Sequence, residues 1–469
     1  MPTFFRYLFC TAVVALTVAA GTRAQTARPS LTGDWFGTLG PIDFAMHLTD
    51  PATGARSATL DIPAQHVQGM AMQFTAPGDS VYLRLARPVA QFAGRRSADD
   101  QQLVGEWQQG LRVLPLTLSR NGSNAAAATT PPNRPQTPQP PFPYQAADIT
   151  FKNEQANVTL AGTYTVPADK GPFPAVILLT GSGPQDRNGS ILNHQPFAVL
   201  ADYLARRGLA VLRFDDRGVG QSGGTQQGMT SADYTTDAQA ALAWLRAQPG
   251  IIKSQVGFIG HSAGGTAAIG AAGQAAGPNF LVLLAAPGLA GDEMMVQQFL
   301  ALTRLKTNSA AQLAAVEKMQ RTIFQIIQKT ADDAQARAQL LALFDPTHSA
   351  SPQVLAQLEP QLAAYTSPFY RHLLADRPAV SLPKVRCPVL ALGGSKDMQV
   401  VAAQNLAATT AALRAGGNRD VTVKELPGLN HLFQTAKTGG PEEYALIEET
   451  FAPAALQVIG DWLMQHTAK

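Results

Sequence analysis

One serine in this sequence stands in a pattern that is typical of an activated nucleophile. Residues 260–264 read Gly-His-Ser-Ala-Gly and match G-x-S-x-G, with Ser262 at the centre. The match directly follows an apolar run at 256–259 and opens a stretch rich in glycine and alanine. A strained turn between a strand and a helix lifts such a serine above a sheet, and the flanking glycines let strand and helix approach closely. The other residues of this predicted nucleophile elbow are Gly260, His261 and Gly264. We expect the His261 side chain to turn away from the substrate.

Two further residues have the types and positions that a serine nucleophile requires. A hydroxyl needs a base to take its proton, and the base needs an acid that orients it. Asp397 follows an apolar run at 388–392, and His431 follows the next predicted strand at 421–424. Both therefore fall on loops at the carboxyl ends of strands, in the chain order Ser, Asp, His that this architecture uses. The sequence predicts a catalytic triad of Ser262, His431 and Asp397.

The elements that must hold these residues alternate between short apolar runs and helical stretches. Strands this apolar, each followed by a helix, indicate a mostly parallel sheet that is covered on both faces. The predicted strands cover 175–179, 210–214, 256–259, 280–284, 388–392 and 421–424, with helices near 197–207, near 231–248 and from 263. The interval 286–387 breaks this rhythm, because its apolar residues follow helical spacing at 294–306, 311–329 and 334–344. We expect it to form a helical cap at about 290–380, over the carboxyl ends of the strands.

The composition excludes several classes of protein and of partner. Of the 469 residues, 45% are apolar and 15% are charged, which excludes a disordered chain. The two cysteines are too few for a small module held together by disulfides. The 36 basic and 33 acidic residues nearly cancel, so there is no electrostatic reason to expect nucleic acid as a partner. H-E-x-x-H, paired-cysteine and P-loop patterns are absent from the sequence, and we expect neither a metal nor a cofactor.

Residues 25–120 are predicted to form a separate small β domain. Alternating apolar and polar residues, for example at 57–62 and 80–85, are separated by glycine, proline and aspartate turns. Two similar segments that hold Trp35 and Trp107 lie near the start and the end of this region. In a small closed or curled sheet the first and last strands are neighbours, and matched tryptophans can plug one end of the core. A structural module is therefore favoured over a ligand-binding barrel.

A linker at 121–146 separates this domain from the predicted hydrolase domain at 147–469. Seven prolines fall between residues 131 and 143. Such a stretch favours extended polyproline conformations and cannot bury a core, so we expect a semi-rigid spacer.

Residues 1–24 have the layout of a secretory signal peptide. Arg6 precedes an apolar run at 7–20 that is too short for a comfortable membrane span. Small residues then occupy the positions that a cleavage between Ala24 and Gln25 requires. We therefore expect an exported protein, periplasmic or extracellular, with no membrane span in the mature chain.

The sequence from about residue 148 to 469 resembles an α/β-hydrolase of the serine esterase type with an inserted helical cap. The resemblance rests on G-H-S-A-G-G at 260–265, on F-D-D-R-G-V-G-Q-S at 214–222, and on the loops of Asp397 and His431. It extends to a secreted bacterial group, often related to dipeptidyl-peptidase-like enzymes, in which a small β domain precedes such a hydrolase. The resemblance implies the α/β-hydrolase fold, whereas these motifs say little about the substrate.

The resemblance also implies an oxyanion hole beside Ser262. Its main-chain N–H groups are expected from Ala263, directly after the nucleophile, and from Ser182 in the loop 180–188. Thr180 stands where lipases and many esterases have histidine, so the loop departs from their pattern at this position.

Charged residues near these loops allow more than one interpretation. We expect Asp186 and Arg187 to pair and to brace the oxyanion loop, although Arg187 could alternatively bind a substrate carboxylate. The acids of the turn 215–217 are interpreted as structural rather than catalytic.

These features favour a carboxylesterase that cleaves small or medium acyl esters of small molecules through an acyl-enzyme. A serine peptidase of the prolyl-oligopeptidase or dipeptidyl-peptidase type has the same triad order and is the first alternative. The β region of about 90 residues is too short for the propeller of the former, and a helical cap fills the insertion. A non-catalytic binding protein on a hydrolase scaffold is the second alternative.

Overall fold

The computed structural model describes most of the chain. The described residues are 29–39, 42–51, 55–62, 67–85, 90–109, 112–120, 133–349 and 352–468. The predicted signal peptide at 1–24 and the first part of the predicted linker, 121–132, lie outside them. Within these ranges, no helix combines the length and the hydropathy that crossing a membrane requires.

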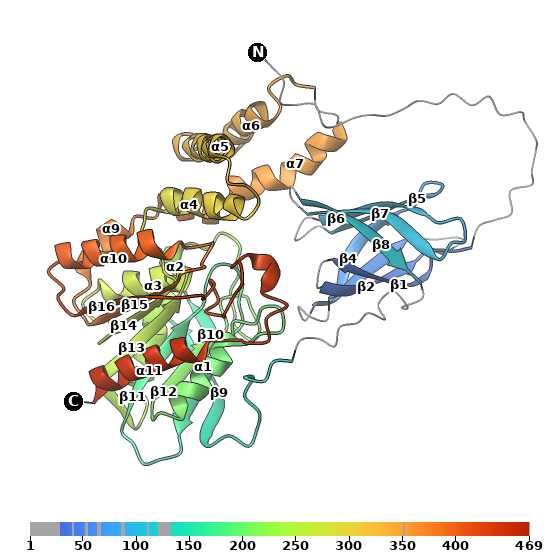
Figure 1. Ribbon diagram of the computed structural model, residues 1–469. Coiled ribbons are helices and arrows are strands. Elements are labelled where there is room, and N and C mark those ends of the chain that lie inside the picture. The colour runs from blue at the N-terminus through green and yellow to red at the C-terminus, as the bar shows by residue number, and fades with distance from the viewer. Residues whose placement is uncertain are drawn as a thin grey trace, which may run out of the picture.

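The amino-terminal unit is a closed barrel of eight antiparallel strands (Figure 1). Its strands are β1 (Gly33–Leu39), β2 (Ile42–Thr49), β3 (Ser57–Ile62), β4 (Val67–Thr75), β5 (Ser80–Leu85), β6 (Ala90–Arg96), β7 (Gln102–Gln109) and β8 (Arg112–Ser119). The barrel closes where Phe36 of β1 pairs with Ser119 of β8. The first and last strands are therefore neighbours, as the sequence predicts.

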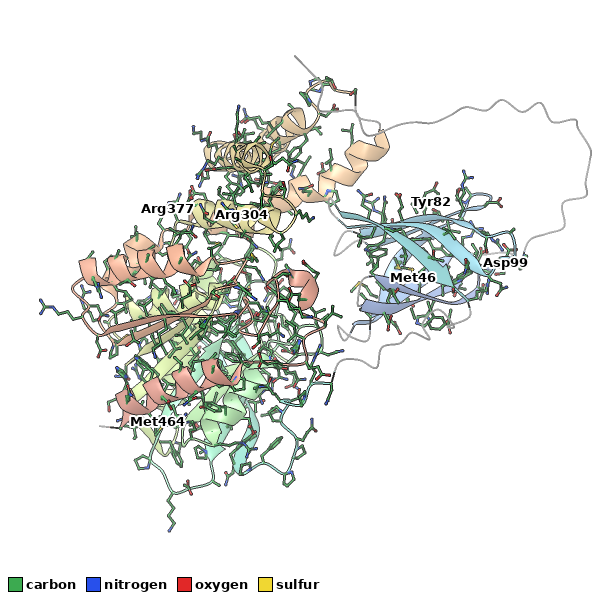
Figure 2. The ribbon with its side chains drawn as sticks, viewed as in Figure 1. Met46, Tyr82, Asp99, Arg304, Arg377 and Met464 are labelled. Carbon is green, nitrogen blue, oxygen red and sulfur yellow. The ribbon has the colours of Figure 1, made fainter. Side chains whose placement is uncertain are left out.

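The barrel interior is a packed hydrophobic core. Successive side chains of a strand point to opposite faces, so Met46 is fully buried inside while Tyr82 points outward and is 46% exposed (Figure 2). Both tryptophans belong to this core, and the Trp35 Nε1–H donates to the Leu31 carbonyl at 2.9 Å. Trp107 lies in β7, the penultimate strand.

The second unit contains a mixed sheet of eight strands in the order β16-β15-β14-β13-β11-β12-β10-β9. Its strands are β9 (Tyr144–Asn153), β10 (Val158–Pro167), β11 (Phe173–Leu179), β12 (Ala210–Phe214), β13 (Ile251–His261), β14 (Leu281–Leu284), β15 (Val389–Gly394) and β16 (Val421–Leu426). The β9–β10 and β10–β12 pairs are antiparallel, and the other pairs are parallel. This architecture and the barrel confirm the predicted fold class.

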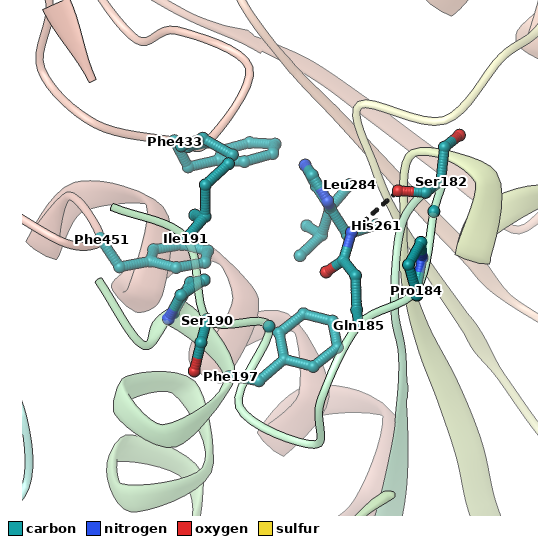
Figure 3. Close-up of a pocket in the computed structure, with 14 residues that line it drawn as sticks. Ser182, Pro184, Gln185, Ser190, Ile191, Phe197, His261, Leu284, Phe433 and Phe451 are labelled. Atoms are coloured by element: carbon teal, nitrogen blue, oxygen red, sulfur yellow. Dashed lines mark hydrogen bonds between the residues drawn. The ribbon is translucent and has the colours of Figure 1, made fainter. Parts of the chain in front are cut away.

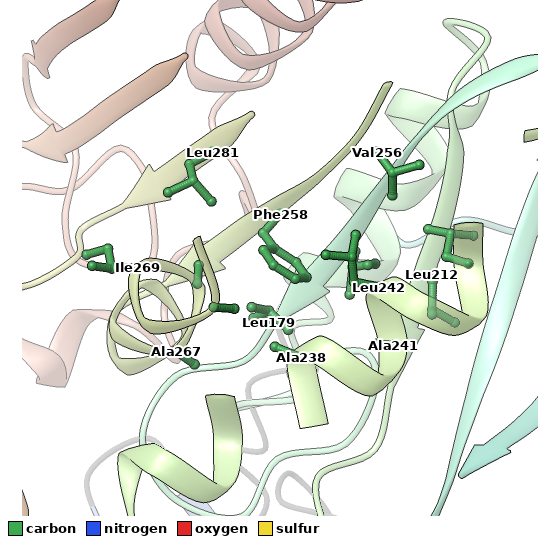
Figure 4. Close-up of a cluster of buried hydrophobic side chains, with 14 of the residues drawn as sticks. Leu179, Leu212, Ala238, Ala241, Leu242, Val256, Phe258, Ala267, Ile269 and Leu281 are labelled. Carbon is green, nitrogen blue, oxygen red and sulfur yellow. The ribbon is translucent and has the colours of Figure 1, made fainter. Parts of the chain in front are cut away.

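Helices cover both faces of this sheet, which explains why its central strands are continuous apolar runs. The covering helices are α1 (Pro196–Ala205), α2 (Ser231–Arg246), α3 (Ala263–Ala272), α10 (Ala402–Ala415) and α11 (Pro453–Thr467). Ile177 of β11 packs in a cluster that includes Ala238 of α2. Figure 4 shows Ala238 together with Leu179 of the same strand. Val176, the residue before Ile177, packs in the opposite cluster with Leu200 of α1.

The interval between β14 and β15 is helical. It contains α4 (Gly291–Arg304), α5 (Ala310–Lys329), α6 (Asp333–Phe344), α7 (Pro352–Tyr365), α8 (Pro368–Ala375) and α9 (Pro378–Ser381). Phe324 of α5 and Leu374 of α8 belong to a separate hydrophobic core of these helices. The sequence analysis identified the first three helices. It missed α7, α8 and α9, which begin at prolines, residues that are tolerated in the first turn of a helix.

Candidate active site

Ser262 occupies a strained turn between a strand and a helix. β13 ends at His261 and α3 begins at Ala263, so Ser262 alone forms the corner. Its φ of 54° and ψ of −121° lie in a region that residues with a side chain rarely adopt. The Ser262 N–H donates to the Leu284 carbonyl of the neighbouring strand at 2.8 Å, and this bond helps to hold the corner in place.

The glycines of the elbow are required by close backbone contacts. A Cβ atom on Gly260 would lie 2.4 Å from the Gly264 carbonyl oxygen. A Cβ atom on Gly264 would lie 2.2 Å from the Leu179 carbonyl oxygen of β11. Both separations are too short for any side chain, so strand and helix approach each other only because these positions are glycine.

Asp397 and His431 lie on loops that follow the neighbouring strands β15 and β16. The His431 Nδ1–H donates to Asp397 Oδ2 at 2.8 Å, and both side chains are almost completely buried. Asp397 Oδ1 accepts from the main-chain N–H groups of Gln399 and Val400 at 2.8 and 2.9 Å. The carboxylate is therefore held at both oxygens, and the imidazole is held in the tautomer that leaves Nε2 free to accept a proton.

His261 connects the elbow to the histidine loop. Its ring centroid lies 4.8 Å from that of His431, and its Nε2–H donates to the His431 carbonyl at 2.9 Å. Among the hydrogen bonds of the described residues there is none between the Ser262 hydroxyl and His431, a contact that often tightens only when substrate binds. Burial lowers the pKa of His261 to about 4, so the ring is neutral near pH 7.

The orientation of His261 bears on one expectation from the sequence. We expected its side chain to turn away from the substrate; in the structure it lines a pocket (Figure 3), and its ring lies next to that of His431. The physical reason is the hydrogen bond to the His431 main chain, which draws the ring toward the histidine loop.

The loop that holds Ser182 approaches Ser262 closely. A Cβ atom on Gly181 would lie 3.5 Å from Ser262 Cβ. Ser182 and Ala263 line one pocket together with Gly181, so the two residues predicted to form the oxyanion hole are neighbours in space.

Asp216 anchors this loop at both ends. Its two carboxyl oxygens accept from Thr180 Oγ1 at 2.7 Å and from the Gln185 N–H at 3.0 Å. Its own N–H donates to the Gln185 carbonyl at 3.1 Å. Burial raises the pKa of Asp216 to about 7, and the nearby Asp237 and Asp215 add to this effect. The sequence analysis assigned this acid a structural role but did not identify its connection to the oxyanion loop.

Arg187, near the end of the same loop, forms ion pairs with acids other than the expected Asp186. It forms ion pairs with Asp215 at 2.8 Å and with Asp148 at 2.9 Å. Asp186 instead accepts from the main-chain N–H groups of its own turn, at residues 188 and 190. The predicted Asp186–Arg187 pair is therefore wrong, because the turn uses the Asp186 carboxylate and the sheet supplies better placed acids.

The pocket beside His261 is apolar and uncharged (Figure 3). Its cavity volume is about 260 Å³, and Phe197, Phe433 and Phe451 contribute to its wall. None of the described residues that line it is Asp, Glu, Lys or Arg. We call it the aromatic pocket.

A second, smaller pocket of about 40 Å³ begins at Ala263 and Ser182 and reaches the helix α8 of the cap. The two residues that flank Ser262 in sequence thus line different pockets, and Ser182 lines both.

No cluster of three or more His, Cys, Asp or Glu side chains that could hold a metal ion occurs in the part of the chain that the structure describes. The groups around Ser262 are suited to acyl transfer, since they include a hydroxyl, an oriented imidazole and main-chain N–H donors.

Comparisons with known proteins place the second unit among hydrolases. Residues 155–425 match the family model of X-Pro dipeptidyl-peptidases, the S15 family. Esterase EstD of Thermotoga maritima is 30% identical over 185 residues, which cover 39% of this chain and 42% of that protein. The chain thus spans less than half the length of this relative. The Pyrococcus furiosus esterase Pf2001 is 17% identical and aligns over 71% of this chain and 98% of its own, with a TM-score of 0.42. The protein PA2218 of Pseudomonas aeruginosa is 16% identical and aligns over 71% and 96%, with a TM-score of 0.43.

Proposed function

The chain belongs to the S15 family of X-Pro dipeptidyl-peptidases, and from this premise and the geometry of the site we propose that it is a serine hydrolase that cleaves carboxylic esters. The observation that carries the proposal is the position of Ser262 on a strained elbow, next to a buried His431–Asp397 pair. We assign Ser262 as nucleophile, His431 as general base and Asp397 as the acid that orients it.

The proposed reaction passes through an acyl-enzyme. His431 Nε2 takes the Ser262 proton while the hydroxyl oxygen attacks the ester carbonyl carbon. The Ala263 and Ser182 N–H groups stabilise the negative oxygen of the tetrahedral intermediate. His431 then protonates the departing alcohol, and the acyl group stays on Ser262. Water, activated by His431, releases the acid and restores the enzyme.

The aromatic pocket supports an uncharged substrate of moderate size. Apolar cavities of about 150 Å³ bind benzene, so a cavity of about 260 Å³ is large enough for an aromatic ring with a short substituent. Because its described lining residues carry no charge at neutral pH, a charged group there would lose its hydration without gaining a partner. These properties favour small or medium acyl esters of small molecules.

A peptidase is the second candidate, and the family match is the observation that favours it. The test compares turnover of p-nitrophenyl esters with turnover of an X-Pro-p-nitroanilide by the purified chain. We expect kcat/KM to be higher for the esters than for the anilide. The ratio of these two values should also exceed the ratio of the uncatalysed hydrolysis rates of the same two substrates. A higher kcat/KM on the anilide would overturn the esterase assignment.

Two further points of the proposal concern export and the alternative of a non-catalytic role. We propose that the protein is exported after cleavage near Ala24, which an intact amino terminus on the cytosolic protein would contradict. A non-catalytic role on the same scaffold would require Ser262 to be unreactive toward a fluorophosphonate probe.

A further inference from the structure

The end of the proline-rich segment carries two side chains that bind main-chain groups of the hydrolase unit. Arg134 donates to the carbonyl oxygens of Ile447 at 2.5 Å, Ala445 at 2.9 Å and Leu192 at 3.1 Å. The planar guanidinium directs N–H donors from two terminal nitrogens in a fixed fork, so it reaches acceptors on two separate stretches of chain, whereas the three donors of a lysine diverge from a single nitrogen.

Gln136 uses both ends of its amide on one short stretch of chain. Its Oε1 accepts from the N–H groups of Thr450 and Phe451 at 2.6 and 3.0 Å. Its Nε2 donates to the Phe451 carbonyl at 2.7 Å. We call residues 444–452, which precede α11, the 444–452 loop. Several of its main-chain N–H and carbonyl groups are thus hydrogen-bonded to side chains of the proline-rich segment.

The 444–452 loop contacts the acid of the proposed triad through one side chain. The Gln399 Nε2–H donates to the Tyr444 hydroxyl at 3.2 Å. The main-chain N–H of the same Gln399 donates to Asp397 Oδ1 at 2.8 Å. The position of Tyr444 is therefore coupled to one of the two N–H groups that hold the carboxylate.

A second route leads to the histidine loop. Thr450 Oγ1 lies 2.9 Å from Nδ1 of the buried His194, whose Nε2–H donates to the Tyr444 carbonyl of the same loop at 2.9 Å. The Gln434 Nε2–H donates to the Glu449 carbonyl of this loop at 3.1 Å. The Gln434 Oε1 accepts from Asn430 Nδ2 at 2.9 Å, directly before His431. The loop is thus joined to the residue beside the proposed base.

The same loop supplies part of the wall of the aromatic pocket. Phe451 lines that pocket and stacks on Phe433, with 5.6 Å between ring centroids and 9° between ring planes. Ile191 lines it as well, and the carbonyl of the next residue, Leu192, is the third acceptor of Arg134. Phe451 and the residue that follows Ile191 are therefore both bound by side chains of the proline-rich segment.

We propose that Arg134 and Gln136 are positioning residues that clamp the 444–452 loop, and thereby hold the histidine loop and the wall of the aromatic pocket in their active geometry. The proline-rich segment is then a working part of the hydrolase unit and not only a spacer between it and the barrel. The inference rests on the proposed esterase site.

The test uses the full chain with Arg134→Lys, Gln136→Met and both changes together. Lysine keeps the charge but lacks the fork, and methionine keeps the length but lacks the amide. Gln139→Met is the matched control, because Gln139 lies in the same segment and its side chain is exposed. Titration with a fluorophosphonate first counts the reactive Ser262 in each preparation, and kcat and KM are then measured per reactive site on p-nitrophenyl acetate, butyrate and hexanoate.

We expect the double variant to lose about tenfold or more in kcat per reactive site, since a displacement of about 1 Å in a catalytic group can cost a hundredfold. The ratio of kcat/KM between hexanoate and acetate should change as well, because the pocket wall moves. Unchanged values per reactive site, with only a smaller number of reactive sites, would overturn the proposal. If wild-type protein gave no reactive site at all, the proposed function itself would fail instead.

Discussion

His431 and Asp397 lie 34 positions apart in the chain and are joined by a hydrogen bond of 2.8 Å between Nδ1 and Oδ2. The loops that carry them follow the adjacent parallel strands β15 and β16, so both loops leave the sheet at the same edge. Two main-chain N–H groups hold the other carboxylate oxygen and prevent its rotation. This arrangement fixes the imidazole before any substrate is present.

The substitution Asp397→Asn tests the role of this bond. The amide oxygen of asparagine can keep the two main-chain N–H groups, but its NH₂ group then faces His431 Nδ1 and favours the tautomer whose Nε2 carries a proton. That tautomer cannot accept the Ser262 proton, so kcat should fall by about 10³-fold or more, as in other triads. Asp420→Asn is the control, because Asp420 forms a more exposed pair with His466. A kcat within a few-fold of the control would contradict the assignment.

His194 predicts a loss of stability in acid. Burial lowers its pKa to about 4, whereas histidine in the unfolded chain titrates near 6.5. The unfolded state therefore takes up a proton first as the pH falls, and stability that is present above pH 6.5 is lost between about 6.5 and 4. His194→Gln removes this group. The difference between the urea midpoints of the wild type and the variant should therefore be smaller at pH 5 than at pH 7. A difference that stays constant would contradict the prediction.

Asp216 predicts the opposite dependence on pH. Burial raises its pKa to about 7, above its value of about 3.9 in an unfolded chain. Its folded form keeps a proton that the unfolded chain has released, so the corresponding stability is complete below about pH 4 and is lost as the pH rises through 7. Asp216→Asn cannot ionise. The urea midpoint of the wild type relative to this variant should therefore decrease between pH 5 and pH 8, and an increase would refute the interpretation.

Two glycines near Ser262 should respond differently to alanine. A Cβ atom on Gly264 would meet main-chain oxygens at 2.2 and 2.4 Å, so Gly264→Ala should destabilise the fold by about 3 kcal/mol. A Cβ atom on Gly181 would meet only side-chain atoms, His261 Nδ1 at 3.3 Å and Ser262 Cβ at 3.5 Å, so Gly181→Ala should cost far less stability while it crowds the nucleophile and lowers kcat. Denaturation midpoints and kcat measured on both variants check this. Equal losses of stability in the two variants would contradict the distinction.

The features that could be predicted from the sequence are those encoded by local patterns. Continuous apolar strands indicated a sheet covered on both faces, and the G-x-S-x-G pattern located the turn of Ser262 because strand, glycine and helix are adjacent in the chain. The family match likewise confirms the resemblance to dipeptidyl-peptidase-like enzymes. The triad and oxyanion assignments remain predictions.

The features that were missed depend on contacts between distant segments. Arg134 and Gln136 lie among prolines, and composition alone predicts a solvated spacer there. Their partners near residue 447 are about 310 positions away, and no local pattern indicates them. The error for Arg187 has the same origin, because Asp186 is adjacent in sequence while Asp215 is adjacent in space.

The most direct test of the central claim is the reactivity of Ser262. The wild-type chain, Ser262→Ala and the control Ser254→Ala, an exposed serine on the same strand β13, are treated with a fluorophosphonate and assayed on p-nitrophenyl butyrate. The wild type and the control should be labelled at Ser262 and should turn over equally. Ser262→Ala should remain unlabelled, with kcat lower by about 10³-fold or more. Labelling of Ser262→Ala, or a wild-type rate from it, would contradict the account.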